Sequence, residues 1–323
     1  MSSFWIRRLW HSVITLFTML TLMFFMFRLL PGDPTATVIS PALYPKAQEA
    51  LKIQFGLDKP LWQQYFSYLS NLASFDFGLS FHTGRPVSEE IGGRLINTIL
   101  LVFPSMIAAY ALGSYAGAII GWRRGSKLET IMVFLSTSLQ SAPVFWLSMI
   151  AILFFSINLD LFPVGHIVTP GMFPDEDWRM YFSLDFLHHL ALPFLINTIY
   201  NFCFPFLLMR SSILSTVGEE YIELARMKGL TEKAVLYRHA MRNSMLPLAT
   251  TLPMTLSGAV AGSVVVETVF SWPGLGLLMV EAVGHSDFPM VQAAFLLIAV
   301  LTVVGTLLAD FLYSVLDPRI VNQ

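Results

Sequence analysis

The chain has 323 residues, of which 55% are hydrophobic and only 12% are charged, and its mean hydropathy is +0.65. Soluble domains carry roughly a quarter charged residues, so the composition excludes an ordinary soluble enzyme and indicates a membrane protein. The net charge of -2 gives no reason to expect a nucleic-acid partner, and none is expected. Cys203 is the single cysteine, which excludes an intrachain disulfide framework.

Long apolar runs predict an all-α protein with six transmembrane helices. A helix that crosses a bilayer needs about 20 mostly apolar residues, and the six runs that meet this length are Leu9–Phe27, Ile99–Ile120, Thr130–Ile157, His189–Met209, Leu248–Phe270 and Val291–Val315. The first run is longer than a signal-peptide core and lacks a convincing cleavage site, so we expect it to be retained as a helix.

The distribution of Lys and Arg predicts the orientation of the spans. These residues gather before the first span, after the second and fourth spans, and at the carboxyl terminus. Positive residues mark the cytoplasmic side, so both termini are expected inside a multi-pass inner-membrane protein. The predicted organisation is an N-terminal region with the first span (1–30), an extracytoplasmic loop domain (31–97) and a five-helix core (98–318).

The first outer loop contains a predicted amphipathic helix. Apolar residues recur at helical spacing after Pro60, a residue suited to the first turn of a helix; they are Trp62, Tyr65, Phe66, Leu69 and Leu72. Because the stretch is rich in aromatic residues, we expect it to lie along the membrane interface or to cover the helix bundle.

Glycines four residues apart occur in two of the predicted spans. They are Gly113, Gly117 and Gly121 in the second span, and Gly258 and Gly262 in the fifth. Small residues at this spacing let helix backbones approach closely within a membrane. Close helix packing is the favoured interpretation, and the lining of a solute path is the alternative.

The segment from Arg210 to Pro247 is charged and has a helical pattern. Its predicted first helix carries an apolar stripe at Leu214, Val217, Tyr221, Leu224 and Ala225. Gly229 is placed to end that helix with a left-handed residue, and Thr231 followed by Glu232 is typical of a second helix start. We therefore expect a helical hairpin that docks a soluble cytoplasmic partner; a solvated connector is the alternative.

Within this segment, the run Glu223-x-Ala225-x-x-x-Gly229 resembles the signature of permease subunits of ABC importers. Its longer form resembles the dipeptide/oligopeptide/nickel permease family, and within it the B-type subunits. That form comprises Glu219-Glu220-Tyr221, Ala225-Arg226, Lys228-Gly229-Leu230, Arg238-His239, Arg242-Asn243 and Leu246-Pro247. Leu224 departs from the pattern, since alanine is common at that position.

Other segments similar to the same family cover nearly the whole chain in order. They are Leu30-Pro31-Gly32-Asp33-Pro34, Gly56-Leu57-Asp58-Lys59-Pro60-Leu61, Asp76-Phe77-Gly78-Leu79-Ser80, Ser141-Ala142-Pro143-Val144-Phe145-Trp146, the run from Glu267 to Gly276, and Leu316-Asp317-Pro318-Arg319.

The resemblance implies a permease that works with separate proteins. These are a second, non-identical permease subunit, two ATP-binding subunits and an extracytoplasmic solute-binding protein, all acting at the lipid membrane. The hairpin would contact an ATPase subunit through Glu219, Glu220, Glu223, Ala225, Arg226 and Gly229. Peptides, nickel chelates, opines, glutathione and oligosaccharides all remain open as the solute.

Several motifs of other function classes are missing from the sequence. The chain has no Gly-x4-Gly-Lys-Ser/Thr loop, so ATP is expected to bind only to partner subunits, and no cofactor or metal is expected. It has no zinc-protease or nucleophile-elbow motif either, so no enzymatic activity is expected. A self-contained secondary transporter is the main alternative, but it leaves the hairpin unexplained and predicts internal repeats that we do not find.

Four polar residues in or near the spans are candidates for the translocation path. Ionisable residues within a membrane are costly and are often functional; Glu267 lies near the outer end of the fifth span and Asp310 near the inner end of the sixth. Asn197 and Asn201, four residues apart in the fourth span, either bridge helices through hydrogen bonds or line a polar path.

Overall fold

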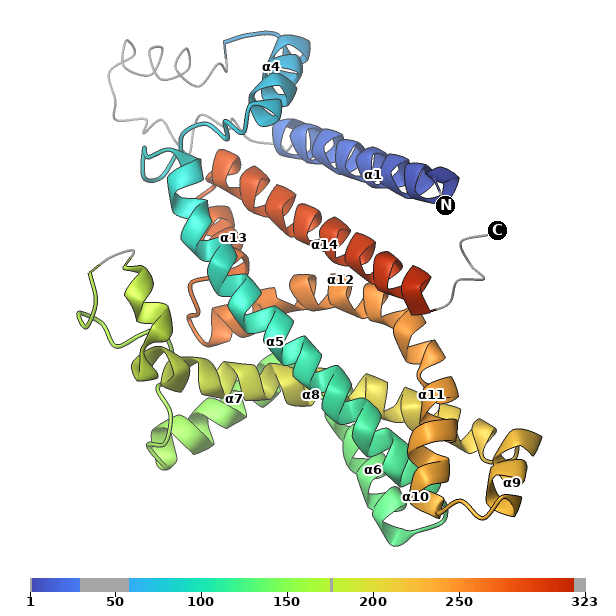
Figure 1. The fold of residues 1–323 in the computed structure, drawn as a ribbon. Coiled ribbons are helices and arrows are strands. Elements are labelled where there is room, and N and C mark those ends of the chain that lie inside the picture. The colour runs from blue at the N-terminus through green and yellow to red at the C-terminus, as the bar shows by residue number, and fades with distance from the viewer. Residues whose placement is uncertain (1, 30–57, 175–176, 317–323) are drawn as a thin grey trace. The chain divides into compact units, whose positions relative to one another are not determined.

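The computed structural model describes residues 2–29, 58–174 and 177–316 (Figure 1). The described residues are almost entirely helical, and their only extended pairing is a single bridge between Leu79 and Pro86. The chain divides into two compact units, one formed by residues 1–97 and 273–301 and the other by residues 98–272 and 302–323. The all-α prediction is confirmed.

The first unit contains α1, α4, the start of α5, α13 and the start of α14. The helices span Ser2–Leu29 (α1), Leu61–Ala73 (α4), Val87–Trp122 (α5), Leu275–Gly284 (α13) and Phe288–Leu316 (α14). A cluster of fully buried side chains, among them Val87, Leu275 and Val291, forms the core of this unit.

The predicted amphipathic helix of the first outer loop is confirmed as α4, which starts directly after Pro60. α4 lies against α1 (Figure 1). The hydroxyls of Tyr65 and Thr21 are hydrogen-bonded at 2.8 Å, and the Tyr65 ring meets Phe24 edge to face at 5.2 Å between centroids. The aromatic face of α4 therefore covers the first apolar helix.

Asp287 anchors the connection between α13 and α14. Its carboxylate is 2% exposed, accepts a 2.5 Å hydrogen bond from the Ser80 hydroxyl and another from the backbone N–H of Phe81 at 3.0 Å. It also accepts from the backbone N–H of Met290 in the first turn of α14. Asp287 thus caps α14 and fixes the loop before α5 with the same side chain.

The second unit contains the rest of α5 and the helices that follow it. They are α6 (Lys127–Ser141), α7 (Val144–Ala151), the π-helix η1 (Ile152–Asn158), the 3-10 helix η2 (Trp178–Phe182), α8 (Leu184–Thr216), α9 (Glu220–Met227), α10 (Glu232–Ala234), the π-helix η3 (Val235–Ala240), α11 (Met241–Ser244) and α12 (Leu246–Val269). The end of α14 completes the unit.

Four helices of the described chain are long and apolar enough to cross a membrane. They lie at Ile6–Met26, Val87–Trp122, Leu184–Thr216 and Phe288–Leu308, and a fifth is added if α6 with α7 and η1 forms one span. α12 coincides closely with the expected span Leu248–Phe270 but is not among these helices. The expected total of six spans therefore stays a prediction.

The predicted span Thr130–Ile157 is helical but is broken near its middle, so it is either one bent span or a re-entrant pair of helices. α6 ends at Ser141, and the axis turns by 103° before the helical pair α7–η1 continues. Ala142 and Pro143 are both extended, with ψ of 136°. Proline has no N–H to donate and disfavours helical backbone in the residue before it, which accounts for the break at this position.

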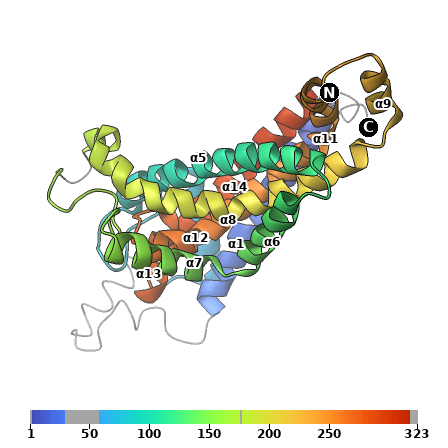
Figure 2. The same cartoon turned by 90° about the horizontal axis from the view of Figure 1, so that it is seen from below.

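α5 and α8 run side by side (Figure 2), and the glycines of α5 lie in close contact with α8. A Cβ atom added at Gly113 would lie 2.8 Å from the carbonyl oxygen of Phe202, and one added at Gly121 would lie 3.0 Å from that of Arg210. The packing interpretation is confirmed for this set. Gly258 and Gly262 of α12 differ, because no described atom lies within 4 Å of an added Cβ at either position.

Candidate functional site

The hairpin segment, residues 210–247, begins as a direct extension of α8. The expected single helix from Leu214 to Gly229 is wrong, because α8 ends at Thr216 and α9 begins only at Glu220. Gly218 lies in the intervening turn, and Glu219 is extended, with ψ of 143°. The break rotates α9, so that Leu224 of the predicted apolar stripe is 52% exposed.

Gly229 ends α9 as predicted. Its φ is +78°, its N–H donates to the carbonyl of Arg226 at 2.9 Å, and the N–H of Leu230 reaches back to Ala225 at 3.4 Å. This is the left-handed helix ending that strongly favours glycine. Nothing lies within 4 Å of an added Cβ at Gly229, so the requirement for glycine comes from the backbone angle and not from lack of space.

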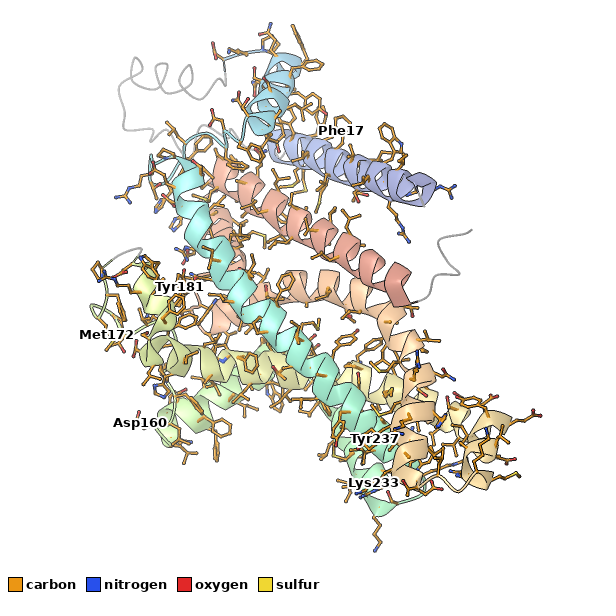
Figure 3. The ribbon with its side chains drawn as sticks, in the orientation of Figure 1. Phe17, Asp160, Met172, Tyr181, Lys233 and Tyr237 are labelled. Carbon is orange, nitrogen blue, oxygen red and sulfur yellow. The ribbon has the colours of Figure 1, made fainter. Side chains whose placement is uncertain are left out.

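Thr231 starts the second half of the hairpin segment, also as predicted. Its hydroxyl accepts a hydrogen bond from the N–H of Ala234 at 3.3 Å. The chain then passes through α10, η3 and α11 into α12. Figure 3 labels Lys233 and Tyr237 on this part, and the Tyr237 hydroxyl donates to that of Tyr115 on α5 at 3.3 Å.

The inner face of the hairpin segment is buried against the ends of α5 and α8. Ile222 and Val235 are completely buried, and Ala225 is 4% exposed. They belong to one hydrophobic cluster with Met209 and Ile213 of α8. The segment is therefore a folded part of the second unit, with a core of its own, and not a solvated connector.

Arg226 joins three elements of this region. Its guanidinium lies 3.1 Å from a carboxylate oxygen of Glu232, which links α9 to α10, and 5.2 Å from the ring centroid of Trp122 at the end of α5. The ion pair is largely exposed and adds little stability by itself. Together with the cation–π contact, it connects the two halves of the hairpin segment to each other and to the end of α5.

The other candidate residues of α9 divide between its two faces. Ala225 faces the core, whereas Glu219, Glu220 and Glu223 are exposed. Within the described chain, none of these three carboxylates forms an ion pair. Met227, 81% exposed, lies on the same helix. The outer surface of α9 thus combines unpaired negative charge with exposed apolar side chains.

Glu129 is a component of this region that we did not single out from the sequence. Both Nε and a terminal nitrogen of Arg210 donate to one of its carboxylate oxygens, the former at 2.9 Å. The other oxygen accepts from the N–H of Gly125 at 2.6 Å, and Ser126 caps α6. The pattern Ser126-x-x-Glu129 is a capping-box signature, so the helix start was readable from the sequence, although the partner 81 residues away was not.

The two asparagines of α8 have different environments. Asn197 is 5% exposed and donates to the Ser105 hydroxyl of α5 at 2.6 Å, as a helix-bridging residue does. Asn201 donates to the backbone carbonyl of Asn197 at 2.8 Å and also lines a cavity of about 160 Å³ between helices of the second unit. The structure thus brings only Asn201 to an open polar space.

Glu267 does not line that cavity. Its side chain is completely buried and accepts hydrogen bonds from the hydroxyls of Thr98 at 2.8 Å and Ser263 at 3.2 Å. Asp310 lies on α14, and its side chain is outside the described set.

The described residues are almost entirely helical and include several apolar helices long enough to cross a membrane, which makes the chain a polytopic membrane protein. Two family models together match almost the whole chain: the N-terminal model for membrane components of binding-protein-dependent transport systems at residues 1–102, and the model for their inner membrane component at residues 109–322. The chain belongs to this family of non-enzymatic transport permeases.

Individual relatives match the chain over its full length. It is 36% identical to the oligopeptide transport system permease protein AppB of Bacillus subtilis over 321 residues, which cover 99% of both chains. It is 35% identical to the dipeptide transport system permease protein DppB of Escherichia coli K12, with 99% of both covered. A di/tripeptide permease protein of Pseudomonas aeruginosa is 33% identical, with both chains covered completely.

Proposed function

We propose that this chain is a permease subunit of an ATP-driven importer for dipeptides or short oligopeptides. The observation that carries the proposal is the full-length similarity to permeases named for peptide transport. Nickel chelates, opines and glutathione are not named for these relatives and are no longer favoured. The working importer would contain a second, non-identical permease, two ATPase subunits and an extracytoplasmic solute-binding protein, and this chain would bind no ATP itself.

The hairpin segment is the element proposed to contact the ATPase. The exposed carboxylates of Glu219, Glu220 and Glu223 offer charge for a basic partner surface, and the neighbouring exposed Leu224 and Met227 offer apolar area. Exposed apolar side chains beside unpaired charge are typical of a protein interface. Ala225, Arg226 and Gly229 would act indirectly, by holding α9 in position.

The proposed placement in the membrane follows from the basic residues. The hairpin segment and both termini would be cytoplasmic in a multi-pass protein of the inner membrane. Residues 31–97 would form an extracytoplasmic loop domain and residues 98–318 the permease core. A secondary transporter would need no ATPase, so import by the purified chain alone would favour that alternative.

Substitution of Gly229 tests the hairpin as the coupling element. Valine at φ +78° is strongly disfavoured, at a cost on the order of 1–3 kcal/mol, so Gly229→Val should reorient α9. Asparagine tolerates this angle, so Gly229→Asn should keep most activity. Gly218→Val is the matched control, because Gly218 has neither a positive φ nor a neighbour within 4 Å of an added Cβ.

The measurements are peptide uptake by the assembled importer and co-purification of the ATPase subunits. Gly229→Val should assemble in the membrane but lose uptake and retain less ATPase than Gly218→Val. Glu223→Lys should have the same effect, whereas Glu89→Lys, a reversal at an exposed carboxylate outside the hairpin segment, should have none. Normal uptake and ATPase retention in both Gly229→Val and Glu223→Lys would show that the hairpin segment does not couple the subunits.

A further inference from the structure

The cavity beside Asn201 has an unusual lining for a membrane helix bundle. Four helices of the second unit, α5, α6, α8 and α12, contribute to it, and its volume is about 160 Å³. Met106 and Phe204 supply apolar surface. The remaining lining side chains are polar but uncharged: Tyr110, Gln140, Tyr200, Asn201 and Thr255.

The cavity lies well inside the apolar part of the helices. Gln140 is 13 residues along α6 from Lys127, and Asn201 is nine residues along α8 from Arg210. At a rise of 1.5 Å per residue these separations are about 20 Å and about 14 Å. The hydrocarbon core of a bilayer is about 30 Å thick, so both separations place the polar lining within that thickness and not at the charged helix ends.

Several of these polar groups have unused hydrogen-bonding capacity. In the described part of the chain, neither the Gln140 amide nor the Tyr200 hydroxyl forms a hydrogen bond. Asn201 uses its amide nitrogen on Asn197, and its Oδ1 has no partner there. Tyr110 and Thr255 differ, because their hydroxyls are hydrogen-bonded to each other, and the Thr255 hydroxyl also reaches the carbonyls of Thr251 and Leu252 in its own helix. Gln140 is exposed, and Tyr200 and Asn201 are half-buried, so their free donors and acceptors can bond to water or to a polar solute that enters the cavity.

The chemistry of the lining selects among solutes. Gln140 and Asn201 carry amides, and each amide offers donors and an acceptor in the same arrangement as a peptide bond. The tyrosine hydroxyls can donate or accept. Among the described residues, no charged side chain lines the cavity, so a charged peptide terminus would lose its hydration without gaining a counter-charge from them. The lining therefore matches neutral amide groups better than charged ones.

We propose that this cavity is a subsite of the translocation path that hydrogen-bonds the main-chain amide groups of a passing peptide. The proposal rests on the proposed function, namely that the solute is a peptide. Sites that hold a complete drug-sized molecule are roughly 300–1,000 Å³, so a cavity of about 160 Å³ takes only part of the solute. Neutral hydrogen bonds suit a transport path, because the solute must bind and also leave. A subsite that binds only the main chain would not distinguish between peptides with different side chains.

The test compares uptake of a dipeptide with uptake of its ester analogue, in which an ester replaces the peptide bond. The ester lacks the N–H and is a weaker acceptor, so an amide-binding subsite should transport it less well. The measurement is the uptake rate of each solute by the complete importer in ATP-loaded vesicles. The amide-to-ester ratio is the uptake rate of the dipeptide divided by that of the ester. Any preference of the solute-binding protein is identical in every variant, so it cancels when these ratios are compared between variants.

Gln140→Leu and Tyr200→Phe should each lower the amide-to-ester ratio about 2- to 10-fold, the range for loss of one hydrogen bond. Neither residue forms a hydrogen bond in the described part of the chain, so both variants should fold. Thr137→Val is the matched control: it lies one turn from Gln140 on α6, is not a lining residue, and bonds only to its own helix. Its ratio should equal that of the parent.

The possible results are distinct. A parent importer that takes up no peptide would refute the proposed function itself. A parent that imports the dipeptide but does not discriminate against the ester would refute amide recognition in transit. Unchanged ratios in both Gln140→Leu and Tyr200→Phe, with the parent discriminating, would refute this cavity as the subsite and leave the importer assignment intact.

Discussion

The contact of α5 with α8 at Gly113 leads to a quantitative prediction. A Cβ added there would lie 2.8 Å from the carbonyl oxygen of Phe202, 2.9 Å from Cγ of Pro205 and 3.1 Å from the backbone nitrogen of Phe206. Relaxed contacts between heavy atoms are about 3.5–4.0 Å, so the overlap is roughly 0.5–1 Å. Backbone atoms and a proline ring cannot rotate away, and Gly113→Ala must therefore push the two helices apart.

The free-energy cost of this overlap in Gly113→Ala can be separated from the stability that alanine gains over glycine in any helix. Overpacking costs typically about 1–3 kcal/mol, while alanine is favoured over glycine in a helix by about 0.8–1 kcal/mol. Gly93→Ala, in the same helix, has the same intrinsic gain, but no described atom lies within 4 Å of its added Cβ. The difference in stability between the two variants should therefore be the overpacking cost alone.

Thermal stability of the purified importer measures this difference. A destabilisation of 1 kcal/mol lowers the midpoint by roughly 2–4 °C for a unit of 150–250 residues, so Gly113→Ala should melt about 2–12 °C below Gly93→Ala. A fluorescent reporter fused to this chain, followed by size-exclusion chromatography after heating, gives the midpoint. Equal midpoints for the two variants would refute the close-packing argument, because both would then have gained only helix propensity.

Two further predictions concern the ends of the spans. Glu129→Gln and Arg210→Gln should each destabilise the importer by about 1–3 kcal/mol in the same assay, because each leaves the partner's charge uncompensated. The double variant should cost less than the sum of the two single variants, and strict additivity would exclude a direct interaction. In a cysteine-free background, Thr231→Cys and Ser126→Cys should resist an impermeant thiol reagent in intact cells, whereas Met172→Cys should react. Labelling of Thr231→Cys from outside would invalidate the orientation.

Features that depend on local backbone chemistry were readable from the sequence. Gly229 and Thr231 have the helix-ending and helix-starting roles expected of them, because both roles depend on a residue's own φ angle or its reach to a nearby N–H. The helix after Pro60 formed for the same reason. The ordered family motifs agreed with the family models that match the chain.

Features that depend on tertiary context were not readable. Pro143 ends α6, whereas Pro104 and Pro205 lie inside continuous helices, and nothing in the local sequence separates the two outcomes. Gly113 and Gly258 are each followed by another glycine four residues later. In the described chain, however, only Gly113 lies against a neighbouring helix. The break at Gly218 was missed because the apolar stripe continues in phase on both sides of it.

The position of α8 gives a physical route between the hairpin segment and the cavity. α8 is one helix from Leu184 to Thr216, so Asn201 at the cavity and Arg210 at the start of the hairpin segment are about 14 Å apart on the same helix. The glycine contacts of α5 prevent the two helices from sliding past each other without a clash, and the Glu129–Arg210 pair ties α6 to the same helix. A displacement of the hairpin segment would therefore move three of the four helices that line the cavity together. α12, the fourth lining helix, directly follows the hairpin segment at its other end, so the hairpin segment is connected along the chain to two of the helices that line the cavity, α8 and α12.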